Sequence, residues 1–169
     1  MKLLRMISSL ERWDGRRDVH RLNPTICGDA IADLRTKNNC LSTWLADTDE
    51  EKDTAVVALA LGRDKADKLC YVILEEQDLK NIEIDISAEC KGEARGLNED
   101  LLTNHRDLVE MDFEHIGKLA NYISPLVRNG QFKVMTKAQV KALLEKFKGN
   151  ELIDITKVND SLKTDLNWE

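Results

Sequence analysis

The chain has 169 residues, of which 42% are apolar and 33% charged, with eight glycines, only two prolines and a formal net charge of −6. This composition is that of one folded domain, and it excludes collagen-like, low-complexity and globally disordered chains. The longest uninterrupted apolar run, residues 55–61, is far shorter than the roughly 20 residues that span a bilayer. We therefore expect a soluble domain without a membrane partner.

Targeting and cysteine signals favour a cytoplasmic protein. The apolar start is interrupted by Arg5 and followed by Glu11 without a small-residue cleavage site, so it does not read as a signal peptide. The four cysteines show neither the CxxC spacing of zinc sites nor the compact spacing of a secreted disulfide framework. We expect free thiols in a reducing compartment and no metal.

Charge is distributed unevenly along the chain. Residues 47–114 carry twenty acidic and eight basic residues, whereas residues 1–46 and 115–169 each carry a net charge of +3. An acidic centre argues against sequence-independent nucleic-acid binding, which requires a basic surface. It suits a partner with a basic surface, and the alternative explanation is that these carboxylates only solvate helix faces and loops.

The first predicted elements lie between residues 1 and 45. Residues 1–10 fit either a strand or a short helix, because their periodicity does not decide. Apolar residues at helical spacing predict a helix over 25–35, after the break at Asn23-Pro24. Residues 40–45 suit a pleated surface and predict a strand.

The next segment predicts a long helix and two strands. Thr48 and Glu51 have the spacing of a capping box, and the apolar run that follows ends at Gly62, which we expect to be left-handed. Residues 69–74 indicate a central buried strand. Residues 82–86 alternate apolar and acidic residues, which is typical of an edge strand.

Residues 87–98 lack periodicity and predict an exposed loop. Asp112 then fits the N-cap of a helix that carries Phe113 and Ile116 on its apolar face. Pro125 should kink or end that helix near residue 124, because proline lacks the amide hydrogen and clashes with the preceding turn.

Two further helices are predicted at the C-terminus. Thr136 and Gln139 form a second capping box, and the apolar residues after them recur at helical spacing up to Gly149. Residues 155–166 predict a last amphipathic helix, with Trp168 near its frayed end.

Together the elements predict an α/β fold, with α+β as the alternative, in which a sheet of three to four strands packs with helices. We expect a single domain over residues 1–169. Within it, residues 1–111 would form the α/β part and residues 112–169 a helical C-terminal subdomain packed on it.

The sequence contains no motif that identifies an activity. Nucleotide-binding glycine loops and the GxSxG elbow are absent, so we expect no cofactor. Histidines and carboxylates between residues 105 and 115 have the chemistry of a metal or hydrolytic site, but their spacing is not diagnostic. Acidic residues in the first turn of a helix are also explained by their favourable interaction with the positive end of the helix dipole.

We therefore predict a non-catalytic, cytoplasmic accessory or regulatory protein that binds another protein, in the manner of an immunity protein, an antitoxin or a defence-system partner. The predicted binding residues are acidic and would face a basic partner surface. They are Glu75, Glu76, Asp78, Glu83 and Asp85. The sequence does not decide whether the chain also forms a homo-oligomer.

Two alternatives belong to other classes. A small metal-dependent hydrolase or nuclease would use His105, Asp107 and His115 as its catalytic residues. Specific nucleic-acid binding would use the arginines between residues 12 and 21 together with the basic C-terminal helix, and the acidic centre of the chain argues against it.

Overall fold

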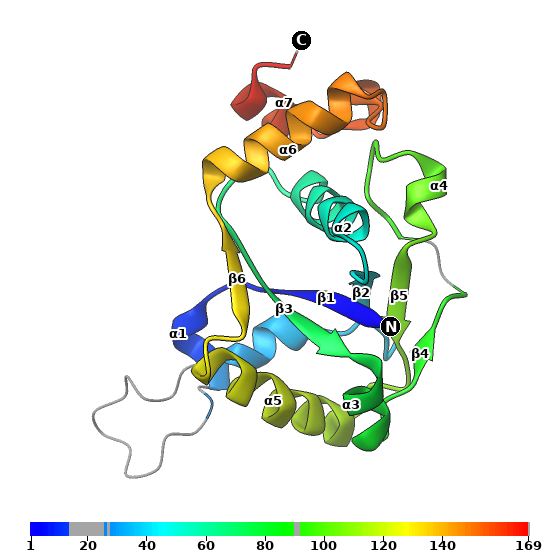
Figure 1. Ribbon diagram of the computed structural model, residues 1–169, viewed down its shortest axis with the longest axis vertical. Helices are drawn as coiled ribbons and strands as arrows, with labels where there is room; N and C mark the ends of the chain where they lie inside the picture. The colour runs from blue at the N-terminus through cyan, green and yellow to red at the C-terminus, as the bar shows by residue number, and fades with distance from the viewer. Residues whose placement is uncertain (14–25, 27, 90–91, 169) are drawn as a thin grey trace.

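The computed structural model describes residues 1–13, 26, 28–89 and 92–168. Its centre is a six-stranded antiparallel sheet in the order β4-β5-β2-β1-β3-β6 (Figure 1). The strands are β1 (Lys2–Ile7), β2 (Leu41–Leu45), β3 (Leu69–Glu75), β4 (Ile86–Ser87), β5 (His105–Leu108) and β6 (Phe132–Met135).

Helices cover both faces of this sheet. The α-helices are α1 (Leu10–Trp13), α2 (Asp49–Leu61), α3 (Glu76–Asn81), α4 (Glu99–Leu102), α5 (Phe113–Arg128), α6 (Lys137–Gly149) and α7 (Asp160–Leu166). Two 3-10 helices are η2 (Gly28–Leu34) and η3 (Ile155–Lys157). In Figure 1, α2, α6 and α7 lie on one side of the sheet, and α1 and α5 lie on the other.

Two apolar cores follow from the alternation of side chains along the strands. Leu4 and Trp44 are register partners on neighbouring strands and pack with α2, α6 and α7. Leu3 and Leu74 are also register partners, but they point to the opposite face and pack with α1, η2 and α5. The sheet therefore separates two independent hydrophobic clusters.

The mixed α/β class is confirmed, but the predicted size of the sheet was wrong, because the sheet has six strands. The sequence prediction missed β5 and β6, which are only four residues long, and β5 consists mainly of polar residues. The segment 112–169, expected to be helical, contributes β6 to the edge of the sheet beside β3. β6 is a strand because it pairs with β3, which lies some 60 residues earlier in the chain.

Local signals located several elements correctly. The capping boxes at Thr48 and Thr136 are both present and begin α2 and α6. The predicted strands at 40–45 and 69–74 correspond to β2 and β3. No helix within the described part of the chain is long and apolar enough to cross a membrane.

Three local expectations were wrong in the first part of the chain. The helix expected over 25–35 is the 3-10 helix η2. Gly62 has a φ of −77° and is not left-handed. The strand expected over 82–86 is reduced to the two residues of β4, because Glu83 adopts a φ of 63° and Ile84 is buried in the core.

Three further corrections concern the C-terminal part. Pro125 does not end α5, which continues to Arg128. The helix expected over 155–166 is divided into η3 and α7. Trp168 is not at a frayed end: it is 5% exposed, and its indole Nε1 donates a hydrogen bond to Glu145 Oε1 at 2.6 Å.

Candidate functional site

The predicted acidic residues lie on β3, on α3 and on the turn before β4. Glu75 forms an ion pair with Lys2, with 3.5 Å between Oε1 and Nζ. Asp78 accepts a hydrogen bond from the Tyr122 hydroxyl at 2.8 Å. Burial raises the pKa of Tyr122 to about 12, so its hydroxyl stays protonated and donates at neutral pH. Both acids are therefore satisfied by groups of the same chain.

Glu76 and Asp85 line a hollow of about 340 Å³, together with Lys80 and Arg106. Glu76 pairs with Lys80 at 2.7 Å. The hydrogen bond from Lys80 holds the pKa of Glu76 below its ordinary value. Asp85 is exposed, and its side chain has no ion pair within the described residues. It is the predicted acid that is most available to a partner.

Glu83 connects the turn after α3 to the first turns of α5. Lys118 Nζ lies 2.6 Å from Glu83 Oε2 and 3.1 Å from Glu114 Oε1. The hydrogen bond from Lys118 lowers the pKa of Glu83, which stays ionised. One lysine thus bridges two carboxylates, and the cluster retains a negative charge.

The same helix end exposes a large apolar side chain. Asp112 caps α5 by accepting a hydrogen bond from the His115 amide at 2.9 Å, which lowers the pKa of Asp112. Phe113, the first helical residue, is 86% exposed. Gly117 lies one turn further along, and a Cβ built there would meet no atom within 4 Å. Phe113, which its spacing placed on the apolar face of this helix, is therefore exposed to solvent.

The structure brings together two of the three residues proposed for a hydrolytic site. His105 and Asp107 project from the same face of β5, with 3.6 Å between Nε2 and Oδ1. Ser42 of β2, which sequence reasoning missed, places Oγ 2.7 Å from the same Nε2. In a hydrolase triad the serine and the acid contact different ring nitrogens. Here both contact Nε2, so the cluster does not have the geometry of a triad.

His115 belongs to a different cluster. Its Nδ1 lies 2.8 Å from Asp112 Oδ1, at the cap of α5. Within the described residues, no group of three or more histidine, cysteine, aspartate or glutamate side chains could hold a metal ion. The hydrolase reading of His105, Asp107 and His115 stays a prediction.

The arginine cluster proposed for nucleic-acid binding falls mostly outside the described residues. Of its members, only Arg12 is described, and its Nη1 lies 3.5 Å from Ser8 Oγ. Arg16, Arg17 and Arg21 are outside the described ranges.

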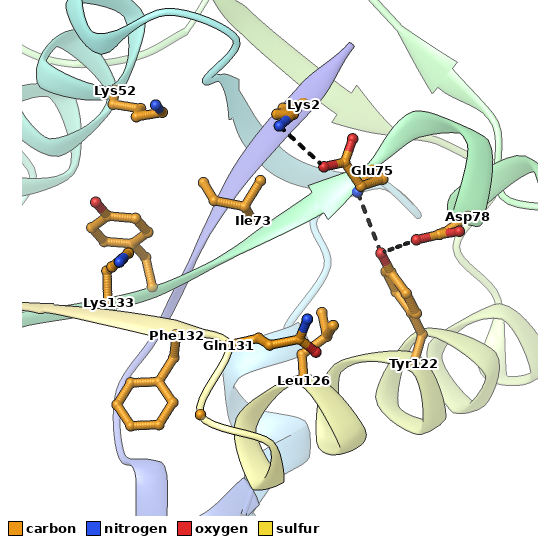
Figure 2. Close-up of a pocket in the computed structure, with 12 residues that line it drawn as sticks. Lys2, Lys52, Ile73, Glu75, Asp78, Tyr122, Leu126, Gln131, Phe132 and Lys133 are labelled. Atoms are coloured by element: carbon orange, nitrogen blue, oxygen red, sulfur yellow. Dashed lines mark hydrogen bonds and ion pairs between the residues drawn. The ribbon is translucent and has the colours of Figure 1, made fainter.

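A groove of about 440 Å³ lies at one corner of the sheet. Ile73 lies on its β3 side and Leu126 of α5 lies opposite (Figure 2). Lys52 and Lys133 are at one end of the groove, and Asp78 is at the other. The groove is therefore apolar in its middle, basic at one end and acidic at the other.

No family model matches the chain, and no curated protein or solved structure matches it either.

Proposed function

We propose that this chain is a non-catalytic protein of the cytoplasm that acts by binding another protein, as immunity proteins, antitoxins and defence-system partners do. The observation that carries the proposal is Phe113, whose side chain is 86% exposed on the first turn of α5. Burial of a phenylalanine side chain contributes about 1.5–3 kcal/mol. Exposed aromatic residues of this kind are typical anchors of protein interfaces.

The surroundings of Phe113 support an interface with a defined charge. We call Phe113, Gly117, Asp112, Glu114 and Glu83 the Phe113 surface. Its three carboxylates have a single lysine, Lys118, between two of them. Because Gly117 has no side chain, a partner can lie flat against the helix beside the phenyl ring.

The chemistry of the partner follows from this arrangement. An apolar pocket would take the phenyl ring, and arginine or lysine side chains around the pocket would face the carboxylates. Charges at the rim of an interface mainly increase the association rate and select the partner, whereas a buried aromatic residue at the centre slows dissociation. The predicted acids of α3 would then contribute to steering, and Phe113 would contribute most of the affinity.

Site-specific photo-crosslinking in the native host tests the proposal. A benzophenone amino acid at position 113 should crosslink to one protein, and the same amino acid at position 31 serves as the control. Ile31 is also an exposed apolar residue, at 51%, but it lies on η2. A crosslink that forms equally at both positions, or at neither, would contradict the Phe113 surface.

Binding measurements with the purified partner then distinguish the contribution of Phe113 from that of the charged residues around it. Phe113→Ala should weaken affinity by about 30-fold, which corresponds to roughly 2 kcal/mol. Ile31→Ala should leave affinity unchanged. Glu114→Lys should slow association, and this effect should diminish as salt is added. Unchanged affinity of Phe113→Ala would refute the proposal, because so exposed a side chain can be removed without unfolding the protein.

A further inference from the structure

The outermost strand β4 presents backbone hydrogen-bonding groups along a free edge. β4 lies at the end of the sheet, and its ladder with β5 places Ile86 opposite Leu108. The Val109 amide donates to the Asp85 carbonyl at 3.0 Å. Hydrogen bonds to one neighbour recur at every second residue of an antiparallel pair, so Asp85 and Ser87 face β5. The amide and carbonyl of Ile86 point to the other side, where no strand of the described chain pairs with them.

Carboxylates and apolar side chains accompany this edge. Asp85 and Glu89 are exposed, and neither has an ion pair within the described residues. The hollow of about 340 Å³ described above is lined by Ile84, Ile86 and Ala88, which are alternate residues of the same segment. An extended chain laid along β4 would therefore meet negative charge and an apolar recess as well as free backbone groups.

The edge adjoins the Phe113 surface. Glu83 belongs to that surface and lies just before β4, and its bond to Lys118 connects it to α5. In Figure 1, α3, β4 and the start of α5 lie at the same corner of the molecule. A protein that covers Phe113 can thus reach β4 as well.

Charge selects the occupant of this edge. A second copy of the chain, paired through the same strand, would bring two acidic segments together, and like charges on neighbouring strands are destabilising. A basic segment would instead face Asp85 and Glu89. The opposite edge of the sheet, β6, carries the exposed Lys133 and would repel such a segment.

We propose that β4 accepts an extended, basic segment of the partner protein as an added strand. The main chain of that segment exchanges hydrogen bonds with Ile86, its lysine or arginine side chains face Asp85 and Glu89, and an apolar side chain between them enters the hollow beside Ala88. In this mode of recognition, main-chain hydrogen bonds give affinity and pockets for alternate side chains give specificity. The inference rests on the proposed function, because it names the kind of segment through which a protein partner binds.

The test uses the full chain, labelled for NMR, and synthetic hexapeptides with blocked ends. The basic probe alternates valine with lysine or arginine, and the acidic probe has glutamate in place of each basic residue. We expect saturable shifts of the Ile86 and Ala88 amides with the basic probe and none with the acidic probe. N-methylation of one peptide amide at a time should weaken binding about tenfold at every second residue and leave it unchanged at the others, because only alternate amides of a strand face its neighbour.

Matched variants locate the binding site on the chain. Ala88→Pro removes an amide that points to the free edge, since the Ser87 carbonyl of the same peptide unit faces β5. Proline is tolerated at such edge positions, and binding should weaken about tenfold. Asp85→Asn should weaken binding about fivefold at low salt. Glu50→Gln removes an exposed acid on α2 that has no ion pair in the described part of the chain, and it should have no effect.

Several results would overturn the proposal. They are the absence of shifts at β4 with millimolar basic probe, equal binding of the basic and acidic probes, N-methylation effects that do not alternate, and wild-type binding by a folded Ala88→Pro variant. A free chain that sediments as a dimer, and that Ala88→Pro converts to a monomer, would identify a second copy as the occupant instead. None of these results changes the crosslink expected from position 113, and loss of that crosslink with intact peptide binding would refute the Phe113 surface alone.

Discussion

Trp13 and Asp33 are joined by a buried hydrogen bond, in which the indole Nε1 donates to Oδ2 at 2.8 Å. The same carboxylate oxygen accepts the Ser8 amide at 3.0 Å and so ties α1 and the end of β1 to η2. Asp33→Ala would leave the buried Trp13 indole and the part-buried Ser8 amide without this acceptor. We expect it to lower the free energy of unfolding by roughly 2–4 kcal/mol, measured by chemical denaturation.

A second variant separates the hydrogen bond from packing. Trp13→Phe removes the indole donor but keeps a large aromatic ring in the core. Combined with Asp33→Ala, it should cost less than the sum of the two single changes, because one unsatisfied donor is then absent. Strict additivity of the two changes would show that this hydrogen bond does not stabilise the fold.

Sequence patterns predicted those elements whose cause is local. The capping boxes at Thr48 and Thr136 satisfy amides within four residues of each other, and α2 and α6 begin there as predicted. The strand β5 has no such signal, because its polar residues become a strand only by pairing with β2. Ser42 and His105 meet across a separation of 63 residues, which no local pattern can indicate.

The candidate site was predicted only in part, for a similar reason. The acids around α3 were named in advance, but Lys2 and Lys118, which pair with Glu75 and Glu83, come from other elements, so this part of the internal pairing could not be foreseen. Phe113 has helical spacing from Ile116 and Ala120, and periodicity alone therefore placed it on the apolar face of the helix. It is the first residue of α5, and its side chain is exposed instead. The groove depends on the β3–β6 pairing and had no signal in the sequence.

Two glycines should respond in opposite directions to the same substitution. Gly117 is inside α5 and has open space around a Cβ, so Gly117→Ala should raise the free energy of unfolding by about 0.5–1 kcal/mol through helix propensity. At Gly92 a Cβ would lie 2.4 Å from Cη2 of Trp44. Gly92→Ala should therefore destabilise the protein. Thermal and chemical denaturation of both variants test this, and equal signs would contradict the packing at Trp44.

Trp168 should be a major contributor to stability although it is the second residue from the C-terminal end. Its ring is buried against the α2–α6–α7 core, and Lys148 Nζ lies 5.1 Å from the ring centroid. Trp168→Ala should cost about 3–5 kcal/mol. Trp168→Phe keeps most of the apolar contact and loses the hydrogen bond to Glu145, so its cost should be clearly smaller. A negligible effect of Trp168→Ala would mean that the end of the chain is not docked in solution.

Asp165 should make the stability of the fold depend on pH in the acidic range. Its carboxylate contacts Lys141 at 3.2 Å and accepts the Ala66 amide at 3.2 Å, so it ties α7 to α6 and to the segment before β3. The hydrogen bond from Lys141 is the main cause that holds the pKa of Asp165 below its ordinary value of 3.8. Because the folded state favours the ionised form, this stabilisation is complete above the ordinary pKa and is lost as pH falls through the lowered value.

Denaturation curves between about pH 6 and pH 2 measure this contribution. Asp165→Asn should be less stable than the wild type near neutral pH, and the difference should shrink as the solution is acidified. Asp85→Asn is the matched control, because Asp85 is exposed and has no ion pair within the described ranges. If Asp165→Asn and Asp85→Asn follow the wild-type pH profile equally, the contacts with Lys141 and Ala66 do not favour the ionised form, and the docking of α7 rests on its apolar face alone.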